Sequence, residues 1–408
     1  MSTPPIRDHT DWPRVLLLVT AGCAASAHVG KVALALPAVA ADLHLDLKTS
    51  ALVPSIFTLM AAIGGVIFGL AARRFGALRL VVGGLLLMSV ASVVGAMADD
   101  VPLLLASRVV EGFGMILTAV AAPALIINET RPEDRRVALG LWSSYIPAGS
   151  SLMMLAGAAI LVPAGWRGVW LLAAAASAAC ALAAWIGLGH HETAPPVALV
   201  RVKWRHAVRE ALHRDSILLA GCFLAYSAQY LAVVSFLPLM LVERAGVPAA
   251  MAGLAGAGVA AANIIGNVGS GWLGNRGWPI ARVVTFAGLG MALCSMAIFA
   301  DASPLWLRLA AAGAFSAVGG FIPGTLLGAT PRLARSPAAA AGVVGLMIQG
   351  AGIGQLLGPP LFVRAMAAVG PQGSWQGAWV FMAAAAAALL MMAAVYGRAT
   401  SFARSRAQ

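Results

Sequence analysis

Charged side chains are scarce in this sequence. Asp, Glu, Lys and Arg make up 10% of the residues, whereas hydrophobic residues make up 61%. Soluble domains carry roughly 25% charged residues, so this composition excludes a water-soluble globular protein. The sequence also lacks the segments of about ten alternating residues that build an outer-membrane barrel. We therefore expect an all-α membrane protein.

Groups that could support catalysis or bind a metal are also scarce. Four cysteines are present, each within a hydrophobic run: Cys23, Cys180, Cys222 and Cys294. None pairs at a metal-ligand spacing, so we interpret them as small hydrophobic residues. The hydrophobic runs hold one histidine, His28, and neither a nucleophile–base pair nor a set of metal ligands. The sequence predicts no enzyme, no metal and no cofactor, and a membrane-embedded enzyme is the rival from another class.

Hydrophobic runs long enough to cross a bilayer, which takes about 20 residues in a helix, occur twelve times along the chain. The predicted spans are 15–39, 50–71, 79–98, 102–126, 137–161, 168–189, 216–241, 250–274, 280–300, 305–328, 338–362 and 377–397.

The net charge of +12 is spread unevenly over the loops between these spans. With both termini in the cytoplasm, cytoplasmic segments hold twenty of the 27 basic residues and the outer ends hold five. Lys and Arg accumulate in the cytoplasmic loops of membrane proteins, so the positive charge requires no nucleic-acid partner. We expect a multi-pass protein of the bacterial inner membrane, surrounded by lipid, with both termini cytoplasmic.

A polar stretch at 190–215 separates six spans from six. It contains two consecutive prolines and five basic residues. The predicted organisation is a cytoplasmic N-terminus (1–14), an N-terminal six-helix bundle (15–189), a cytoplasmic linker (190–215), a C-terminal six-helix bundle (216–397) and a cytoplasmic tail (398–408).

Three sequence echoes relate the two bundles. The paired segments, with their offsets, are 166–170 and 375–379 (209), 69–76 and 271–276 (202), and Pro147 and Pro359 (212). Two parallel repeats, related by an axis along the membrane normal, are one of the known plans of secondary transporters.

On these motifs the chain resembles the major facilitator superfamily over nearly its whole length. The segment from Gly69 to Gly76 is similar to the family signature G-x-x-x-D-[RK]-x-G-[RK], although Arg73 stands at the acid's position, and Ala77 and Leu78 stand where the family has basic residues. Arg108 to Gly114 is similar to the fourth-helix signature R-x-x-[QE]-G-x-G. Gly165-Trp166-Arg167 is similar to the turn between helices five and six. The resemblance implies two pseudo-symmetric six-helix halves that work by alternating access.

The resemblance also implies gating roles for the signature loops and for the proline-containing helices. The residues concerned are Gly69, Arg73, Arg74, Gly76, Pro147, Gly271, Asn275, Arg276, Gly358 and Pro359. Arg73 cannot accept the hydrogen bonds that the family's acid accepts, and it repels Arg74. We therefore expect a weakened inner gate and a relatively favoured inward-open state.

Two of the few charges within the spans are cations at similar depth. At 1.5 Å per residue, Lys31 lies roughly 6 Å and Arg108 roughly 8 Å outside the midplane. The resemblance implies that the first and fourth helices line the central cavity, so both cations are candidates to bind an anionic substrate. Glu111 is the one acid well inside the spans. It is the candidate for proton coupling, since a buried carboxylate can titrate between two exposures.

Structural interpretations of these charges stay open. Arg108 and Glu111 lie one turn apart and could pair only to stabilise packing, and a close arginine would oppose protonation of Glu111. Lys31 has no evident acidic partner in the bilayer, and its alternative is a solvated position near the outer mouth. Further substrate contacts are expected from uncharged residues, namely Tyr145, Tyr226, Gln229 and Tyr230. The alternative for each is an interhelical hydrogen bond, worth about 0.6–2 kcal/mol.

The sequence thus predicts a proton-coupled symporter of a small organic or inorganic anion, acting as a monomer, with the solute and protons as its partners. The segments 30–37 and 142–147 are loosely similar to the cyanate and nitroimidazole porter group. Proton-driven efflux of drugs or metabolites is the alternative. The fifth-helix motif of exporters, G-x-x-x-G-P-x-x-G, is incomplete because Ile146 precedes Pro147, and cationic drugs would favour more acids in the cavity.

Overall fold

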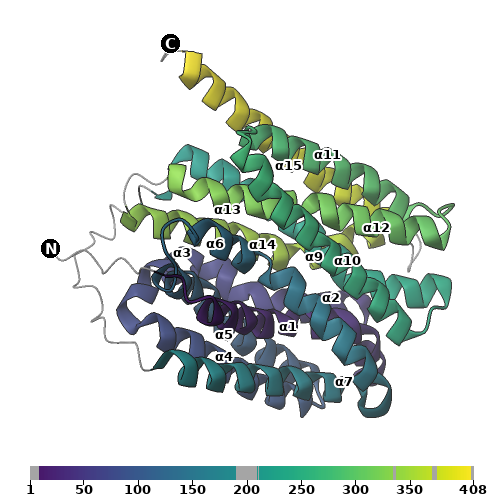
Figure 1. Ribbon diagram of the computed structural model, residues 1–408. Helices are drawn as coiled ribbons and strands as arrows, with labels where there is room; N and C mark the ends of the chain where they lie inside the picture. The colour runs from purple at the N-terminus through teal and green to yellow at the C-terminus, as the bar shows by residue number, and fades with distance from the viewer. Residues whose placement is uncertain (1–8, 190–208, 210, 334–336, 370–374, 406–408) are drawn as a thin grey trace.

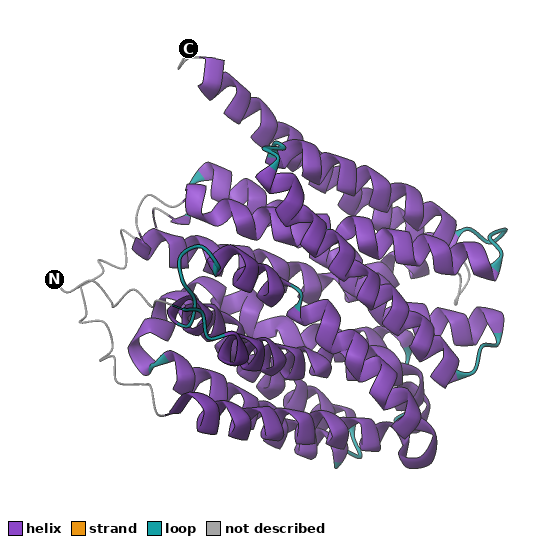
Figure 2. Ribbon diagram, in the orientation of Figure 1, coloured by secondary structure: helices purple, strands orange, loops and turns teal. Residues whose placement is uncertain are grey.

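The chain folds into long helices that run side by side (Figure 1). This computed structural model describes residues 9–189, 209, 211–333, 337–369 and 375–405. Regular structure within these ranges is helical throughout (Figure 2). Eleven helical segments of the described chain are long and apolar enough to cross a membrane.

One of these segments, α7 (Tyr145–Leu188), supplies two crossings. It is 44 residues long, and Gly165 interrupts it with φ 62° and ψ −169°. A Cβ placed on Gly157 would lie 3.1 Å from Cγ1 of Val169, whereas twelve residues of straight helix extend about 18 Å. The helix therefore turns back on itself at Gly165, where a positive φ favours glycine. The predicted turn at Gly165-Trp166-Arg167 is confirmed, and the crossings number twelve.

The N-terminal half forms one group of mutually packed helices. They are α1 (Trp12–Asp42), α2 (Leu47–Ser55), η1 (Ile56–Thr58), α3 (Leu59–Phe75), α4 (Ala77–Ala96), α5 (Val101–Asn128), α6 (Arg135–Ser143) and α7. α1 packs against α5 and α7, and α4 packs against the same two helices. The second crossing consists of α2, η1 and α3 in succession, and its short 3₁₀ segment follows Pro54.

The C-terminal half repeats this plan. Its helices are α9 (Arg214–Ala245), α10 (Ala249–Asn275), α11 (Ile280–Phe299), α12 (Leu305–Gly319), α13 (Phe321–Leu333), α14 (Pro337–Val369), η3 (Trp375–Gly377) and α15 (Ala378–Ser405). α14 lies against α9, and three glycines let the backbones approach: a Cβ on Gly350, Gly354 or Gly358 would come within 2.5 Å of a carbonyl oxygen of α9. These glycines lie four residues apart and form a close-packing stripe along α14.

Two more predicted spans are interrupted in the structure, besides the span at 50–71, which is divided among α2, η1 and α3. The span at 137–161 is divided between α6 and α7, with a break at Ser144. Pro147 therefore lies in the first turn of α7, where a missing amide proton costs little. The chain bends at Ser144, before this proline. The span at 305–328 is divided between α12 and α13 at Gly320. A Cβ there would lie 2.2 Å from the carbonyl oxygen of Asn263, so tight contact with α10 sets this break.

With twelve crossings, both chain ends lie on one face of the bundle, which we call the termini face. A first seam between the halves is formed by α2 and α3 with α14. The hydroxyl of Thr58 donates to the carbonyl oxygen of Gly352 at 3.3 Å. A Cβ on Gly65 would lie 2.7 Å from the carbonyl oxygen of Gly345. Because Gly65 and Gly345 lie toward the termini face, the halves are in contact there.

The second seam joins α7 to α10. The hydroxyl of Ser151 donates to the carbonyl oxygen of Ala257 at 2.8 Å, and Gly253 faces the side chain of Leu34 from α1. The structure therefore shows closed seams between the halves rather than the inward-open arrangement expected from Arg73. The expected shift in the population of states stays a prediction.

The predicted gating residues of the two signature loops lie at the ends of α3 and α10, which occupy corresponding places in the two halves. Gly69, Arg73 and Arg74 belong to the last turns of α3, and their side chains lie outside the described residues, as do most residues of the linker. Gly76 links α3 to α4 with φ 83°. In the second half, Gly271 and Asn275 lie in the last turns of α10. Arg276 follows, with its guanidinium 3.6 Å from the ring centroid of Trp272, and Pro359 and Pro360 lie within α14.

Candidate functional site

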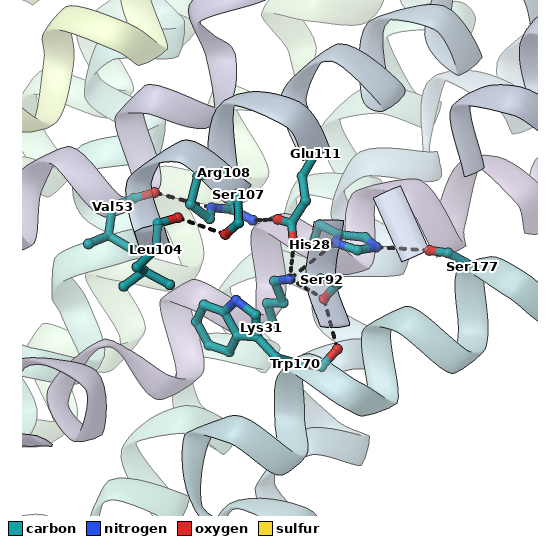
Figure 3. A network of polar contacts seen from close by, with 10 residues as sticks. All are labelled: His28, Lys31, Val53, Ser92, Leu104, Ser107, Arg108, Glu111, Trp170 and Ser177. Atoms are coloured by element: carbon teal, nitrogen blue, oxygen red, sulfur yellow. Dashed lines mark hydrogen bonds and ion pairs between the residues drawn. The ribbon is translucent and has the colours of Figure 1, made fainter. Parts of the chain in front are cut away.

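A buried charge network occupies the interior of the N-terminal half, with Glu111 at its centre (Figure 3). α5 presents Arg108 and Glu111 one turn apart, and α1 presents His28 and Lys31 one turn apart. One carboxylate oxygen of Glu111, Oε1, accepts from Nζ of Lys31 at 2.5 Å. The other, Oε2, accepts from Nη1 of Arg108. Each carboxylate oxygen therefore holds one cation.

Lys31 uses all three of its N–H groups inside the protein. Besides Glu111, Nζ contacts Oγ of Ser92 at 2.6 Å and Nδ1 of His28 at 3.2 Å. The ammonium also lies 4.7 Å from the ring centroid of Trp170. Since an ammonium has three donors, Lys31 has none left for a substrate in this conformation.

The hydrogen bonds around Lys31 indicate which of its partners donate and accept, and which tautomer His28 adopts. Oγ of Ser92 donates to the carbonyl oxygen of Trp170 at 2.8 Å, so it accepts from Lys31. Nδ1 of His28 accepts from Lys31, and Nε2 of the same ring lies 2.8 Å from Oγ of Ser177. The neutral tautomer with hydrogen on Nε2 satisfies both contacts. Nδ1 also lies 3.4 Å from Oε1 of Glu111.

Arg108, in contrast, keeps donors in reserve. Its Nε donates to the carbonyl oxygen of Val53 at 3.3 Å, and its guanidinium lies 4.4 Å from the ring centroid of Phe57. Nη1 donates to Glu111. Nη2 has no hydrogen-bond acceptor among the residues that the structure describes, which leaves its two N–H groups unused.

With Lys31 and Arg108 protonated, the network carries a net positive charge out of contact with bulk solvent. His28, Lys31, Arg108 and Glu111 are each 0% exposed. Two cations and one carboxylate, with a neutral imidazole, sum to +1. A buried charge is costly unless it is paired. The network therefore gains stability when it takes up an anion or releases a proton.

Several expectations can be compared with this geometry. The pairing of Arg108 with Glu111 is confirmed. The expectation that Lys31 lacks an acidic partner is wrong, as is its alternative of a solvated position, because Glu111 bridges both cations out of contact with solvent. Sequence reasoning missed this bridge because i,i+3 spacing reveals partners on one helix only.

Sequence reasoning also missed three polar members of the network. His28 carried a signal, since it lies one turn before Lys31 on α1. Ser92 and Ser177 carried none, because serines are common in such helices and only packing brings α4 and α7 to α1.

The polar residues predicted in the C-terminal half form a separate cluster. The rings of Tyr226 and Tyr230 stack with centroids 5.7 Å apart. Nδ2 of Asn263 donates to Oη of Tyr226 at 3.0 Å, and Nδ2 of Asn267 donates to Oδ1 of Asn263 at 2.8 Å. Nε2 of Gln229 donates to the backbone of its own helix at 3.0 Å. These contacts are the interhelical and local hydrogen bonds that the sequence left open as an alternative.

Tyr145 lies at the break between α6 and α7. Its ring stacks on Trp142 with centroids 4.3 Å apart, and both side chains pack over Gly22 of α1. Its carbonyl oxygen accepts from Oγ of Ser26 at 2.7 Å. Within the described residues, neither Tyr145 nor the C-terminal cluster has a hydrogen bond or ring contact with Lys31, Arg108 or Glu111.

The sequence model of the Major Facilitator Superfamily matches residues 16–359. This chain belongs to that family. Its twelve helices in two pseudo-symmetric halves are the family's fold, and it is accordingly a multi-pass membrane transporter. Members move small solutes across membranes, which fits the buried polar groups of both halves.

Curated relatives match over parts of the chain. An uncharacterized MFS-type transporter of Mycobacterium tuberculosis is 32% identical over 35% of this chain and 24% of that protein. The multidrug efflux pump LfrA of Mycolicibacterium smegmatis is 31% identical over 35% of this chain and 28% of the pump. The inner membrane transport protein YajR of Escherichia coli is 30% identical over 32% of this chain and 29% of that protein. The chain thus spans less than a third of each of these relatives.

Solved structures match over the whole chain. A bacterial homolog of the human lysosomal transporter Spinster, in an inward-facing and occupied conformation, aligns with a TM-score of 0.73 at 18% identity, covering 98% of both chains. Its inward-facing, unoccupied conformation aligns with a TM-score of 0.71 and covers 97% of both. At this level of identity, the similarity shows a shared fold.

Proposed function

We propose that this transporter is a proton-coupled symporter of a small organic or inorganic anion. The observation that carries the proposal is the buried network, whose charge sums to +1 while Nη2 of Arg108 keeps two N–H groups unused among the described residues. An anion at Nη2 would bring this charge to zero, whereas a cation would raise it. A guanidinium can also hold a carboxylate through two parallel hydrogen bonds.

Lys31 and Arg108 then have different roles. Arg108 contacts the anion, because its planar fork has donors to spare. Lys31 holds Glu111 and sets the charge of the network, because all three of its N–H groups are already bonded. Tyr226, Gln229 and Tyr230 are proposed to face the solute when the seams between the halves open.

Glu111 is the proposed site of proton coupling. A proton on its carboxyl group removes the one negative charge and leaves Lys31 and Arg108 as two buried cations. An anion then binds more strongly, because it offsets a larger unpaired charge. Binding is reciprocal, so the bound anion favours protonation of Glu111 by the same factor. Proton and anion therefore cross together, as in uptake driven by the proton gradient.

The proposed setting is the bacterial inner membrane, with both termini in the cytoplasm. The bias of basic residues toward the termini face supports this orientation. The protein is proposed to act as a monomer that alternates between open states on the two faces, with the seams of α3 with α14 and α7 with α10 as its gates.

A ligand screen with a proton readout tests the proposal. Purified protein is melted in the presence of small carboxylates, inorganic anions or cationic drugs, since a ligand at 100 times its Kd stabilises a protein by about 2.7 kcal/mol. A pH indicator in weakly buffered solution then measures protons taken up per ligand bound. We expect an anion to raise Tm and to bind together with a proton. Stabilisation by cations alone would overturn the proposal.

The second candidate function is proton-driven drug efflux. It is favoured by the printed names of relatives, among them the pump LfrA and a multidrug export protein, EmrB, of Haemophilus influenzae that is 29% identical over 39% of this chain. In that case Glu111 would attract a cationic drug and release a proton when the drug binds. The same screen separates the two candidates, because proton release with a cation would replace proton uptake with an anion.

A further inference from the structure

We infer that His28 is the group through which protons enter and leave the charge network, with Ser177 as the next acceptor. This inference rests on the proposed proton coupling and assigns the route that serves Glu111. The route runs from the Lys31–Glu111 pair, through the imidazole ring, to the hydroxyl on α7 (Figure 3).

The ends of the hydrogen-bond chains single out this branch. From Lys31, the chain through Ser92 ends at the carbonyl oxygen of Trp170. From Glu111, the chain through Arg108 ends at the carbonyl oxygen of Val53. A carbonyl oxygen accepts a hydrogen bond and has no proton to pass on. Both chains are therefore closed to proton transfer.

The branch through His28 has a different end. It reaches Oγ of Ser177, a hydroxyl that can accept one proton and donate another. Nδ1 of His28 faces both proton-holding groups, at 3.2 Å from Nζ of Lys31 and 3.4 Å from Oε1 of Glu111. Nε2 faces away from them, toward α7. The ring thus links the Lys31–Glu111 pair to the hydroxyl on α7 through two separate nitrogens.

The transfer can be written as two balanced steps. In the first, one N–H bond of Lys31 breaks and an N–H bond forms on Nδ1 of His28, so that a neutral amine and an imidazolium replace the ammonium and the neutral ring. In the second, in a conformation that admits water, Nε2 gives its hydrogen to Oγ of Ser177 while the O–H bond of the serine breaks and its hydrogen passes to a water molecule as hydronium, which leaves the ring neutral with hydrogen on Nδ1 and the serine unchanged. One positive charge leaves the network. Rotation of the ring or the reverse steps restore the original tautomer.

The surroundings of His28 suit this role. The charged groups that face the ring are Lys31 on its own helix and Glu111 with Arg108 on α5. α4 contributes the hydroxyl of Ser92, and α7 contributes the hydroxyl of Ser177 and the ring of Trp170. All of these side chains are buried. Bulk solvent does not reach the ring in this conformation, so a proton passes between side chains before it can reach water.

The test uses reconstituted protein and compares two measurements on each variant. Counterflow measures exchange of the anion identified in the screen without net proton movement, and accumulation under an imposed pH gradient measures coupling. His28→Asn retains an acceptor near Nδ1 but does not titrate. We expect the ratio of accumulation to exchange to fall by about tenfold or more, since a positioned proton-transfer group contributes a factor on the order of 10².

Two serine variants provide matched comparisons, because each removes one buried hydroxyl of the network. Ser177→Ala should lower the ratio of accumulation to exchange, as His28→Asn does. Ser92→Ala should change both measurements together and leave their ratio at the parent value, because its branch ends at a carbonyl. Melting curves identify any variant that fails to fold, and Ser177→Ala decides the question if His28→Asn is lost.

The outcomes separate this inference from the function on which it rests. If Glu111→Gln loses accumulation while His28→Asn and Ser177→Ala retain the parent ratio between pH 6 and pH 8, the route through His28 is refuted and the proposed function stands. An equal loss of the ratio in Ser92→Ala and Ser177→Ala also refutes the route. If the parent protein takes up no proton with its anion, the proposed function itself fails.

Discussion

The two halves of this transporter share a fold but differ in what their interiors contain. The N-terminal half buries Lys31, Arg108, Glu111 and His28 in one connected network. The C-terminal half buries a neutral cluster of tyrosines and asparagines centred on Asn263. Removing a charged side chain from the N-terminal network should therefore lower the free energy of unfolding far more than removing an amide from the C-terminal cluster. The comparison suggests that coupling chemistry resides in one half while the other serves as its neutral counterpart.

Unsatisfied neutral groups occur in both halves, and in the described part of the N-terminal half they include Oγ of Ser144 and Nε1 of Trp170. Within the described part of the C-terminal half, Oε1 of Gln229, Oδ1 of Asn267 and Oγ of Ser316 are buried without a hydrogen-bond partner. Neutral groups tolerate this at a cost of about 1–3 kcal/mol each. In the N-terminal half both carboxylate oxygens of Glu111 and all donors of Lys31 are paired, because an unpaired buried ion would cost more.

The largest contrast is expected from removing the central acid. Glu111→Leu leaves two buried cations without their partner and should destabilise the protein by about 3–5 kcal/mol. Asn263→Leu in the C-terminal half removes hydrogen bonds to Tyr226 and Ser316 and should cost only about 1–2 kcal/mol. Thermal unfolding of both variants in the same detergent measures the difference. Equal losses would contradict the view that charge distinguishes the two interiors.

The second-largest contrast is expected in anion affinity, which should depend on the two cations of the N-terminal half, Arg108 and Lys31. Arg108→Lys keeps the charge but loses the planar fork, and since a hydrogen bond to a charged group contributes about 1.5–3 kcal/mol, affinity should fall roughly 10- to 100-fold. Lys31→Gln should also weaken binding strongly, because the network then sums to zero before the anion arrives. Gln229→Leu is the control from the C-terminal half and should have the smallest effect. Equilibrium binding to purified variants measures all three, with Tm as the folding control, and unchanged affinity in both cation variants would refute the anion site.

Two glycines of α14 should separate packing within a half from packing between halves. A Cβ on Gly354 would lie 2.1 Å from the carbonyl oxygen of Leu224 on α9, in the same half. Gly354→Ala should therefore lower stability, by about 1–3 kcal/mol for an overpacked contact. A Cβ on Gly352 would lie 2.7 Å from the amide nitrogen of Ala62, across the first seam.

Gly352→Ala should leave Tm nearly unchanged, because the seam can open while each half stays folded. Distances between spin labels on α3 and α14 should lengthen in this variant and stay at the parent value in Gly354→Ala. A Tm loss in Gly352→Ala as large as that in Gly354→Ala would show that the seam belongs to a rigid core.

The smallest effects are expected at exposed ion pairs on the opposite face, and these should be alike in the two halves. Arg167 pairs with Asp99 at 2.9 Å in the first half, and Arg244 pairs with Asp301 in the second. Asp99→Asn and Asp301→Asn should each change stability by no more than about 1 kcal/mol, because solvent and salt screen such pairs. Melting at low and high salt checks this. A large difference between the two would locate part of the asymmetry at the surface.

The sequence was most informative where a single residue or a long run sets the structure. Twelve hydrophobic runs predicted twelve crossings, and Gly165 marked the turn that divides α7 because a positive φ favours glycine. Gly350, Gly354 and Gly358 lie four residues apart in the sequence, but the sequence does not identify α9 as the helix that they contact. The breaks at Ser144 and Gly320 were missed, because hydropathy within a run does not report where a helix bends against its neighbours.

For the candidate site, composition alone determined that the few intramembrane charges matter, since each is costly in lipid. The spacing of three residues between Arg108 and Glu111 also predicted that they share a helix face. Only the tertiary structure decided that Glu111 holds Lys31 as well, that Ser92 and His28 complete the shell of Lys31, and that Arg108 retains unused donors. The physical reason is that spacing along one helix is local, whereas a partner on another helix is selected by how the helices pack.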